Sequence, residues 1–206
     1  MELKPTNTEQ AILEAAEKIF FQKGYTGART TEIAEAAGVN HALLHYYFRT
    51  KEALFERIFQ EKTTQLVSFL VQAFDSDLPF FEKIKLGIEK HFDFIAQNLG
   101  LPFFIIREII QNEDRKQIVH QRLAPIAFEM NKRLSVLIQE EIDKGTIRPV
   151  NAQDLLLNLM SLNVFSFLAL QVLFDVKSGC QSKNHKQFLE ERKKNNVETI
   201  INSIKI

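Results

Sequence analysis

Hydroxyl, imidazole, phenol and cationic side chains are concentrated between Thr30 and Lys51, in the stretch TTEIAEAAGVNHALLHYYFRTK. Groups of these types hydrogen-bond to phosphate oxygens and to the edges of nucleic-acid bases, so the stretch could bind DNA. The competing interpretation is an ordinary helical hairpin whose polar face is simply solvated. The elements that would position these side chains help to decide between the two.

The apolar spacing of this stretch predicts two short helices joined by a tight turn. Thr30 or Thr31 could cap the first helix, because a hydroxyl oxygen can accept from a free N–H group at a helix start. Gly38 could end it as a residue of positive φ, and Asn40 could cap the second helix. This order is typical of a helix-turn-helix unit, in which the second helix enters the major groove of DNA.

The flanking segments make the pattern more specific. ILEAAEKIFFQKGYTGART predicts a helix that ends near Gly24, and Thr50 could cap a further helix through KEALFERIF. ILEAAEKIFFQKGYTGART, TTEIAEAAGVN and HYYFRTKEAL together resemble the amino-terminal domain of the TetR family of transcriptional regulators. The resemblance covers about the first quarter of the chain with its spacings intact, which favours DNA binding over a simple hairpin.

The resemblance implies a role for individual residues in DNA binding. Residues that hold phosphates would set the register on DNA, and residues on the exposed side of the second helix would face base edges. Leu44 and Phe48 would instead pack in the core. The phosphate-holding positions are Arg29, Thr31, Tyr47 and Lys51. The base-facing positions are His41, Ala42, Leu43 and His45, flanked by Tyr46, and Thr30 and Asn40 complete the predicted DNA-binding set.

Two of these positions depart from the family pattern, which commonly has a small polar residue and a tyrosine where this chain has Leu43 and His45. Leu43 cannot hydrogen-bond to a base, but it can contact the methyl group of thymine. His45 can donate or accept a hydrogen bond. We therefore expect a DNA site with at least one position that depends on a thymine methyl.

The charge balance is unusual for a DNA-binding protein. The net charge of the chain is zero, and the first 57 residues hold seven Lys and Arg against eight Asp and Glu. Helix N-termini and hydroxyl groups must then supply many of the phosphate contacts. Because few cations displace few counterions, we expect a shallow dependence of DNA affinity on salt.

Composition and missing motifs exclude other classes. The 206 residues are 45% hydrophobic, which suffices for a core, and the single cysteine, Cys180, excludes an internal disulfide framework. Without an apolar signal segment at the N-terminus, we expect a cytoplasmic location.

The sequence has no phosphate-binding glycine loop, nucleophile motif or paired-carboxylate signature, so we expect no enzyme and no cofactor. His41 and His45 are four residues apart, but two ligands rarely suffice for a metal, and no metal site is predicted.

Beyond Lys51 the sequence keeps helical periodicity and shows no strand alternation. Gly100, Pro125 and Gly145 mark helix boundaries or kinks. We predict an all-α protein of about nine helices, with a helix-turn-helix domain at 1–50 and an effector-binding and dimerisation domain at 51–206. The later helices are expected at about 51–74, 80–98, 102–112, 115–144, 155–174 and 185–206.

The second domain contains most of the eighteen phenylalanines, and the chain has no tryptophan. The resemblance implies an effector pocket in this domain, whereas plain core packing is the alternative for each aromatic residue. Polar residues within apolar segments could orient a mostly apolar effector, with Arg107 meeting an acidic or polar group. The predicted pocket residues are Phe69, His91, Phe92, Asn98, Phe103, Phe104, Arg107, Gln111, Asn158 and Phe165.

Residues 155–174 carry no charge over a membrane-spanning length. Asn158, Ser161 and Asn163 interrupt the segment, which favours a buried helix of a water-soluble protein, with no membrane partner, over a transmembrane one. The resemblance implies that it forms a homodimer interface together with the last helix. The predicted interface residues are Leu159, Leu162, Phe188, Val197, Ile200, Ile201 and Ile204.

These predictions combine into one functional expectation. The resemblance implies a homodimeric, ligand-responsive repressor that leaves a palindromic operator in double-stranded DNA when a small apolar effector binds. Two recognition helices about one turn of DNA apart would enter successive major grooves. The alternative is a helical protein-binding scaffold of the same fold that has lost DNA binding, which the neutral first domain would suit.

Overall fold

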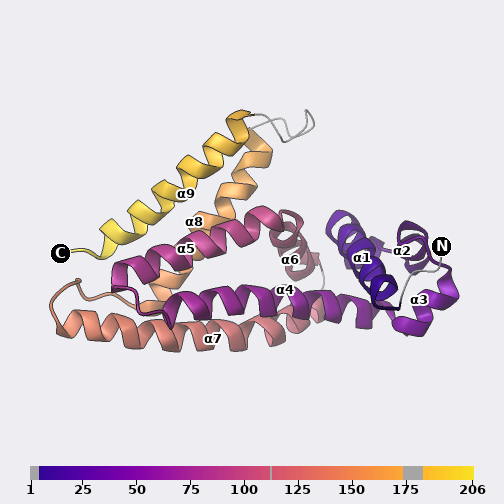
Figure 1. Ribbon diagram of the computed structural model, residues 1–206, viewed down its shortest axis with the longest axis horizontal. Helices are drawn as coiled ribbons and strands as arrows, with labels where there is room; N and C mark the ends of the chain where they lie inside the picture. Colours follow the sequence, from indigo (N-terminus) through magenta and orange to yellow (C-terminus); the bar gives the residue numbers. More distant parts are fainter. Residues whose placement is uncertain (1–4, 112, 174–182) are drawn as a thin grey trace. The chain divides into compact units, whose positions relative to one another are not determined.

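The computed structural model describes residues 5–111, 113–173 and 183–206, which form nine α-helices and no β-strand (Figure 1). The all-α prediction is confirmed. Cys180 and the side chain of Gln111 lie outside the described residues. The helices are α1 (Pro5–Gly27), α2 (Thr30–Ala36), α3 (His41–Tyr47), α4 (Lys51–Phe74), α5 (Phe80–Gln97), α6 (Gly100–Gln111), α7 (Glu113–Asp143), α8 (Ala152–Leu173) and α9 (Lys183–Ile204).

The chain forms two compact units. Unit 1 consists of residues 1–65 and 100–120, and unit 2 of residues 66–99 and 121–206. The division of functions after residue 50 stays a prediction. Within the described residues, α6 belongs to the same compact unit as the first three helices.

The core of unit 1 is aromatic. The rings of Phe20, Phe55 and Phe104 come from α1, α4 and α6, and their centroids are 5.6 to 6.5 Å apart. All three side chains are buried. Because aromatic pairs at these separations add to the gain from burial, this cluster fixes α6 against α1 and the start of α4.

Helix boundaries in unit 1 follow the predicted signals closely. Gly24 has a φ of 73° and interrupts α1, although one further turn continues to Gly27. Gly38 has a φ of 68°, as expected for the residue that ends α2. The Thr50 Oγ1 atom accepts from the Ala53 amide at 3.0 Å and caps α4.

The core of unit 2 is aliphatic for the most part. It draws on α4, α5, α7, α8 and α9, and Ile88 and Leu134 are almost completely buried within it. Pro125 lies inside a continuous α7, so the prediction of a new helix at this residue is wrong and that of a kink is left open. The buried core residues are Phe74, Phe80, Ile84, Ile88, Met130, Leu134, Ile138, Ile147, Ala152, Leu155, Leu159, Val197, Ile200 and Ile204.

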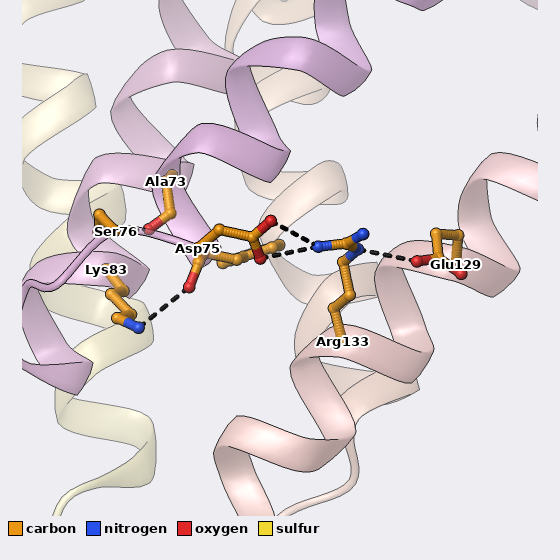
Figure 2. Close-up of polar contacts among 7 residues, drawn as sticks. Ala73, Asp75, Ser76, Lys83, Glu129 and Arg133 are labelled. Atoms are coloured by element: carbon orange, nitrogen blue, oxygen red, sulfur yellow. Dashed lines mark hydrogen bonds and ion pairs between the residues drawn. The ribbon is translucent and has the colours of Figure 1, made fainter.

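Charged side chains hold the carboxyl end of α4 within unit 2 (Figure 2). The guanidinium of Arg133 on α7 donates to both carboxylate oxygens of Asp75, at 2.7 and 2.8 Å, and to Glu129 at 2.8 Å. Lys83 donates to the carbonyl oxygen of Phe74 at 3.0 Å. Since the last carbonyls of a helix have no partner within it, these contacts complete the helix end and bind it to α5 and α7.

Candidate DNA-binding surface

The turn between α2 and α3 is built from backbone and side-chain hydrogen bonds. The amides of Gly38 and Val39 donate to the carbonyls of Glu35 and Ala34 at 3.0 and 2.9 Å. The Oδ1 atom of Asn40 accepts from the Leu43 amide at 2.8 Å, which confirms Asn40 as the N-cap of α3. The recognition helix therefore starts from a defined point.

The start of α2 differs from the prediction. Arg29 occupies the N-cap position with extended backbone and makes no side-chain capping bond, so neither Thr30 nor Thr31 caps this helix. The hydroxyl of Thr30 instead lies 3.0 Å from Nε2 of His41. The predicted cap is wrong because Thr30 is already the first residue of the helix and does not precede it. Its hydroxyl instead connects α2 to α3.

The predicted DNA-binding residues lie close together in unit 1, on α2, α3 and the residues that flank them. Leu44 is fully buried beneath α3, and Phe48 is also buried, as predicted. Tyr46 is 78% exposed, and its ring contacts that of Tyr47. The exposed members of the set are Arg29, Thr31, Asn40, His41, Ala42, His45 and Tyr46, and the half-buried members are Thr30, Leu43, Tyr47 and Lys51.

Lys51 has a structural role that its sequence position does not reveal. Its ammonium group donates to the carbonyl oxygens of Tyr25 and Ala28, both at 3.0 Å, and lies 4.4 Å from the centroid of the Tyr25 ring. It therefore joins the start of α4 to the end of α1. A phosphate contact by Lys51 stays a prediction.

Charges near this surface are partly neutralised. Lys23 donates to both carboxylate oxygens of Glu32 at 3.0 Å, and this hydrogen bond lowers the pKa of Glu32. Lys62 pairs with Glu17 at 2.8 Å. In each pair the lysine and the acid offset one another, so neither pair adds net positive charge that would attract a phosphate.

Sequence reasoning missed a clamp between α6 and the end of α1. The buried carboxylate of Glu108 accepts from the Tyr25 amide at 2.9 Å, immediately after the break at Gly24. Arg107 donates to the Gln22 carbonyl at 3.2 Å. The φ of 73° at Gly24 favours glycine, and a Cβ atom there would lie 3.0 Å from Cδ of Arg107, so that side chain would have to shift. The available signal is the pair of charged residues, Arg107 and Glu108, within an apolar segment; the sequence analysis assigns only Arg107, as an effector contact, and gives Glu108 no role.

The predicted pocket residues divide between the two units. Phe103, Phe104 and Arg107 belong to unit 1, where Phe104 is core and Arg107 is part of the clamp. Phe69, His91, Phe92, Asn98, Asn158 and Phe165 belong to unit 2. In unit 2, Phe92 is core and contacts Phe167, whereas Asn158 and Phe165 are exposed. Their role in effector binding stays a prediction.

A buried polar network connects α5, α8 and α9 in unit 2. The fully buried Asn163 donates to the Ile88 carbonyl at 3.0 Å and lies 3.1 Å from Nδ1 of His91. Asn196 donates to Oδ1 of Asn163 at 2.9 Å. Burial lowers the pKa of His91 to about 4, so the ring is neutral and its Nδ1 can accept from Asn163.

The predicted dimer residues are largely internal. Leu159, Val197, Ile200 and Ile204 are buried in the core of the single chain, so they do not form the outer surface of α8 and α9. Leu162, Phe188 and Ile201 are half-buried. The outer face of α8 instead presents three large apolar side chains that the prediction did not assign to the interface: Leu157, Met160 and Phe165, which are 62%, 47% and 66% exposed.

The helix α8 is also long and apolar enough to cross a membrane by length and composition. The qualifying segment is Ala152–Leu170, with a mean hydropathy of 1.4, and about a third of it is buried. A core helix of a water-soluble protein passes the same test, so length and hydropathy are a weak indicator. The exposed apolar face therefore needs another explanation.

The fold and this surface define a helix-turn-helix transcriptional regulator. Residues 12–58 match the family described as bacterial regulatory proteins, tetR family. The HTH-type transcriptional repressor AcnR of Corynebacterium glutamicum is 36% identical over 147 residues, which are 70% of this chain and 71% of that protein. The chain belongs to the TetR family.

Two further comparisons concern regulators from Bacillus subtilis. The fatty acid metabolism regulator protein of Bacillus subtilis is 26% identical over 137 residues, 66% of this chain and 69% of that protein. The structure of the transcriptional regulator FadR from Bacillus subtilis in complex with stearoyl-CoA has a TM-score of 0.69 and 20% identity, and the match covers 93% of this chain and 96% of that one. The latter comparison shows the shared fold. These relatives are named as regulators of transcription or metabolism.

Proposed function

We propose that this regulator is a repressor that binds a palindromic operator as a homodimer, in the cytoplasm, and leaves it when an apolar effector binds. The observation that carries the proposal is the recognition helix α3, which Asn40 caps and Leu44 anchors while His41, Ala42 and His45 remain exposed. Side chains so placed can reach base edges in the major groove.

Selection of bound fragments from the native genome tests DNA binding. Enrichment of one palindromic sequence is expected, and failure to enrich any sequence would favour the protein-binding scaffold.

The selected operator then allows two finer tests. Replacing its thymines by uracil should weaken binding at the position that Leu43 contacts, and a steep decrease in affinity with salt would contradict the small number of cationic contacts.

The apolar face of α8 supports the dimer. A surface of three exposed large apolar side chains is costly in water, and a second copy of the chain would cover it. We therefore reassign Phe165 from the effector pocket to the dimer surface. Phe165→Glu should yield a monomer in sedimentation experiments and weaken operator binding. Phe128→Glu on α7 is the matched control, since Phe128 is 71% exposed, and it should remain dimeric.

The effector is proposed to carry a long acyl chain. Support comes from the regulators of fatty acid metabolism among the relatives and from a chain rich in phenylalanine. Stearoyl-CoA should raise the melting temperature and release the operator, whereas coenzyme A without the acyl chain should do neither. If only highly charged, hydrophilic compounds shift the melting temperature, an apolar effector is excluded.

A further inference from the structure

His41 and His45 form an exposed pair on one face of the recognition helix. Their ring centroids are 4.4 Å apart and their planes are nearly perpendicular, at 84°. Residues four apart on a helix lie one above the other, so both rings can reach a single ion placed beside the helix. Both side chains are exposed, which leaves room for that ion and its water ligands.

A hydrogen bond of His45 leaves one of its ring nitrogens available to a metal ion. The Nδ1 atom of His45 lies 3.1 Å from the carbonyl oxygen of Arg49. A carbonyl only accepts, so Nδ1 carries the proton and Nε2 keeps its lone pair. Histidines that bind metals usually donate their other ring N–H to a carbonyl or carboxylate in this way.

His41 is less constrained than His45. Its Nε2 atom lies 3.0 Å from the Thr30 hydroxyl, which can donate or accept. Because this bond is exposed, a metal ion can replace it at the cost of one solvent-accessible hydrogen bond. The two imidazoles are then free to turn toward a common ion.

We infer that His41 and His45 bind a first-row divalent metal ion, with Cu²⁺ preferred over Ni²⁺ and Zn²⁺. Imidazole suits these metals, and Cu²⁺ is the tightest bound in this series. Within the described part of the chain, no group of three or more His, Cys, Asp or Glu side chains could hold a metal. The site is therefore open, with water at the remaining positions, and its ion exchanges readily. No metal site is predicted from the sequence, because two protein ligands rarely suffice; in the site inferred here, water completes the coordination of an ion held by both rings.

A bound ion would regulate DNA binding, a consequence that rests on the proposed function. The two rings lie among the residues that we propose to face base edges. An ion that holds both rings and its own waters prevents them from making those contacts. Cu²⁺ should therefore lower operator affinity, and a chelator should restore it.

Titration of the untagged protein with Cu²⁺ tests the site itself. Calorimetry should show one ion per chain at this site, and the electron paramagnetic resonance spectrum should show coupling to two imidazole nitrogens. Removing a group that hydrogen-bonds to a metal-binding histidine typically lowers metal affinity about 10-fold or more, and removing the histidine itself should lower it at least as much. His41→Ala and His45→Ala should therefore each weaken Cu²⁺ binding about 10-fold or more. His120→Ala, which removes a single exposed histidine on α7, is the matched control and should bind as the wild type does.

Each outcome is decisive. Cu²⁺ binding that is unchanged in His41→Ala and His45→Ala, with circular dichroism showing both variants folded, would overturn the site. Operator binding that persists in the Cu²⁺-loaded protein would overturn the regulation alone. If the metal-free protein binds no DNA, the proposed function fails, while the titration still decides whether the metal site exists.

Discussion

The two units differ in the sequence distance over which their polar contacts act. In unit 1, the bonds that shape the recognition helix join residues close together in the chain: Asn40 bonds to Leu43, and Thr30 to His41. In unit 2, Asn163 bonds to Ile88, 75 residues away, and Lys193 bonds to Asp93, 100 residues away. Local contacts can be inferred from spacing, whereas distant ones depend on how the helices pack.

The clamp on α1 is the longest-range exception described within unit 1. Glu108 and the Tyr25 amide are 83 residues apart, yet their bond supports the end of α1 beside Lys51, which also contacts Tyr25. The DNA-binding unit thus combines a local recognition motif with a distant support on α6. Substitutions at these contacts test how far this contrast extends.

Replacing Asn163 should produce the largest loss of stability. Asn163→Leu removes three buried hydrogen bonds, to Asn196, to the Ile88 carbonyl and to Nδ1 of His91, and so takes a partner from each of these groups. We expect the free energy of unfolding to decrease by about 3 kcal/mol, measured by urea denaturation. The control, Asn158→Leu on the exposed face of the same helix, should change it by less than about 0.5 kcal/mol. Equal effects would contradict a specific role for the network.

Acidification should weaken unit 2 through His91. Burial lowers the pKa of His91 from its ordinary value of 6.5 to about 4 in the folded chain, so the unfolded state takes up this proton first as pH decreases. Stability is therefore fully present above pH 6.5 and is lost between 6.5 and about 4, by about 3 kcal/mol in total.

The measurement is the free energy of unfolding from urea titrations across this pH range. His91→Phe replaces the ring with one that cannot titrate, so the difference between pH 7 and pH 4 should shrink relative to the wild type. An unchanged pH profile in this variant would assign the acid sensitivity to other groups.

Loss of the clamp should have an intermediate effect, centred on unit 1. Glu108→Ala leaves the Tyr25 amide without its acceptor and opens a space at the end of α1, and we expect a loss of about 2 kcal/mol. Glu108→Gln keeps an acceptor oxygen of the same reach and should retain most of the stability. If the two variants are equally destabilised, the carboxylate charge matters more than the hydrogen bond.

The smallest effect is expected at the cap of α3. Asn40→Ala should cost about 1 kcal/mol, because the Leu43 amide loses its acceptor, while Asn40→Ser should restore most of it. Thermal unfolding of both variants gives the comparison. Hydrogen exchange of the Leu43 amide should accelerate in the alanine variant only, and an unchanged rate would argue against the cap.

Much of the fold followed from the sequence because its signals are local. The glycine at position 38, the cap at Asn40 and the cap at Thr50 were all predicted where the structure has them. The cap by Thr30 failed because spacing does not distinguish a residue that precedes a helix from the first residue within it. The predicted DNA-binding residues lie in unit 1 on α2, α3 and the residues that flank them, and their contacts with DNA stay a prediction.

The sequence alone determined the helix-turn-helix and the all-helical class, because periodicity, caps and glycine turns act within a few residues. Only the tertiary structure decided that Arg107 and Glu108 clamp α1, that Lys51 binds the end of that helix, and that His91 is satisfied by Asn163. A sequence can show a polar residue among apolar ones, but its partner comes from a distant segment. The packing of whole helices determines which segment that is.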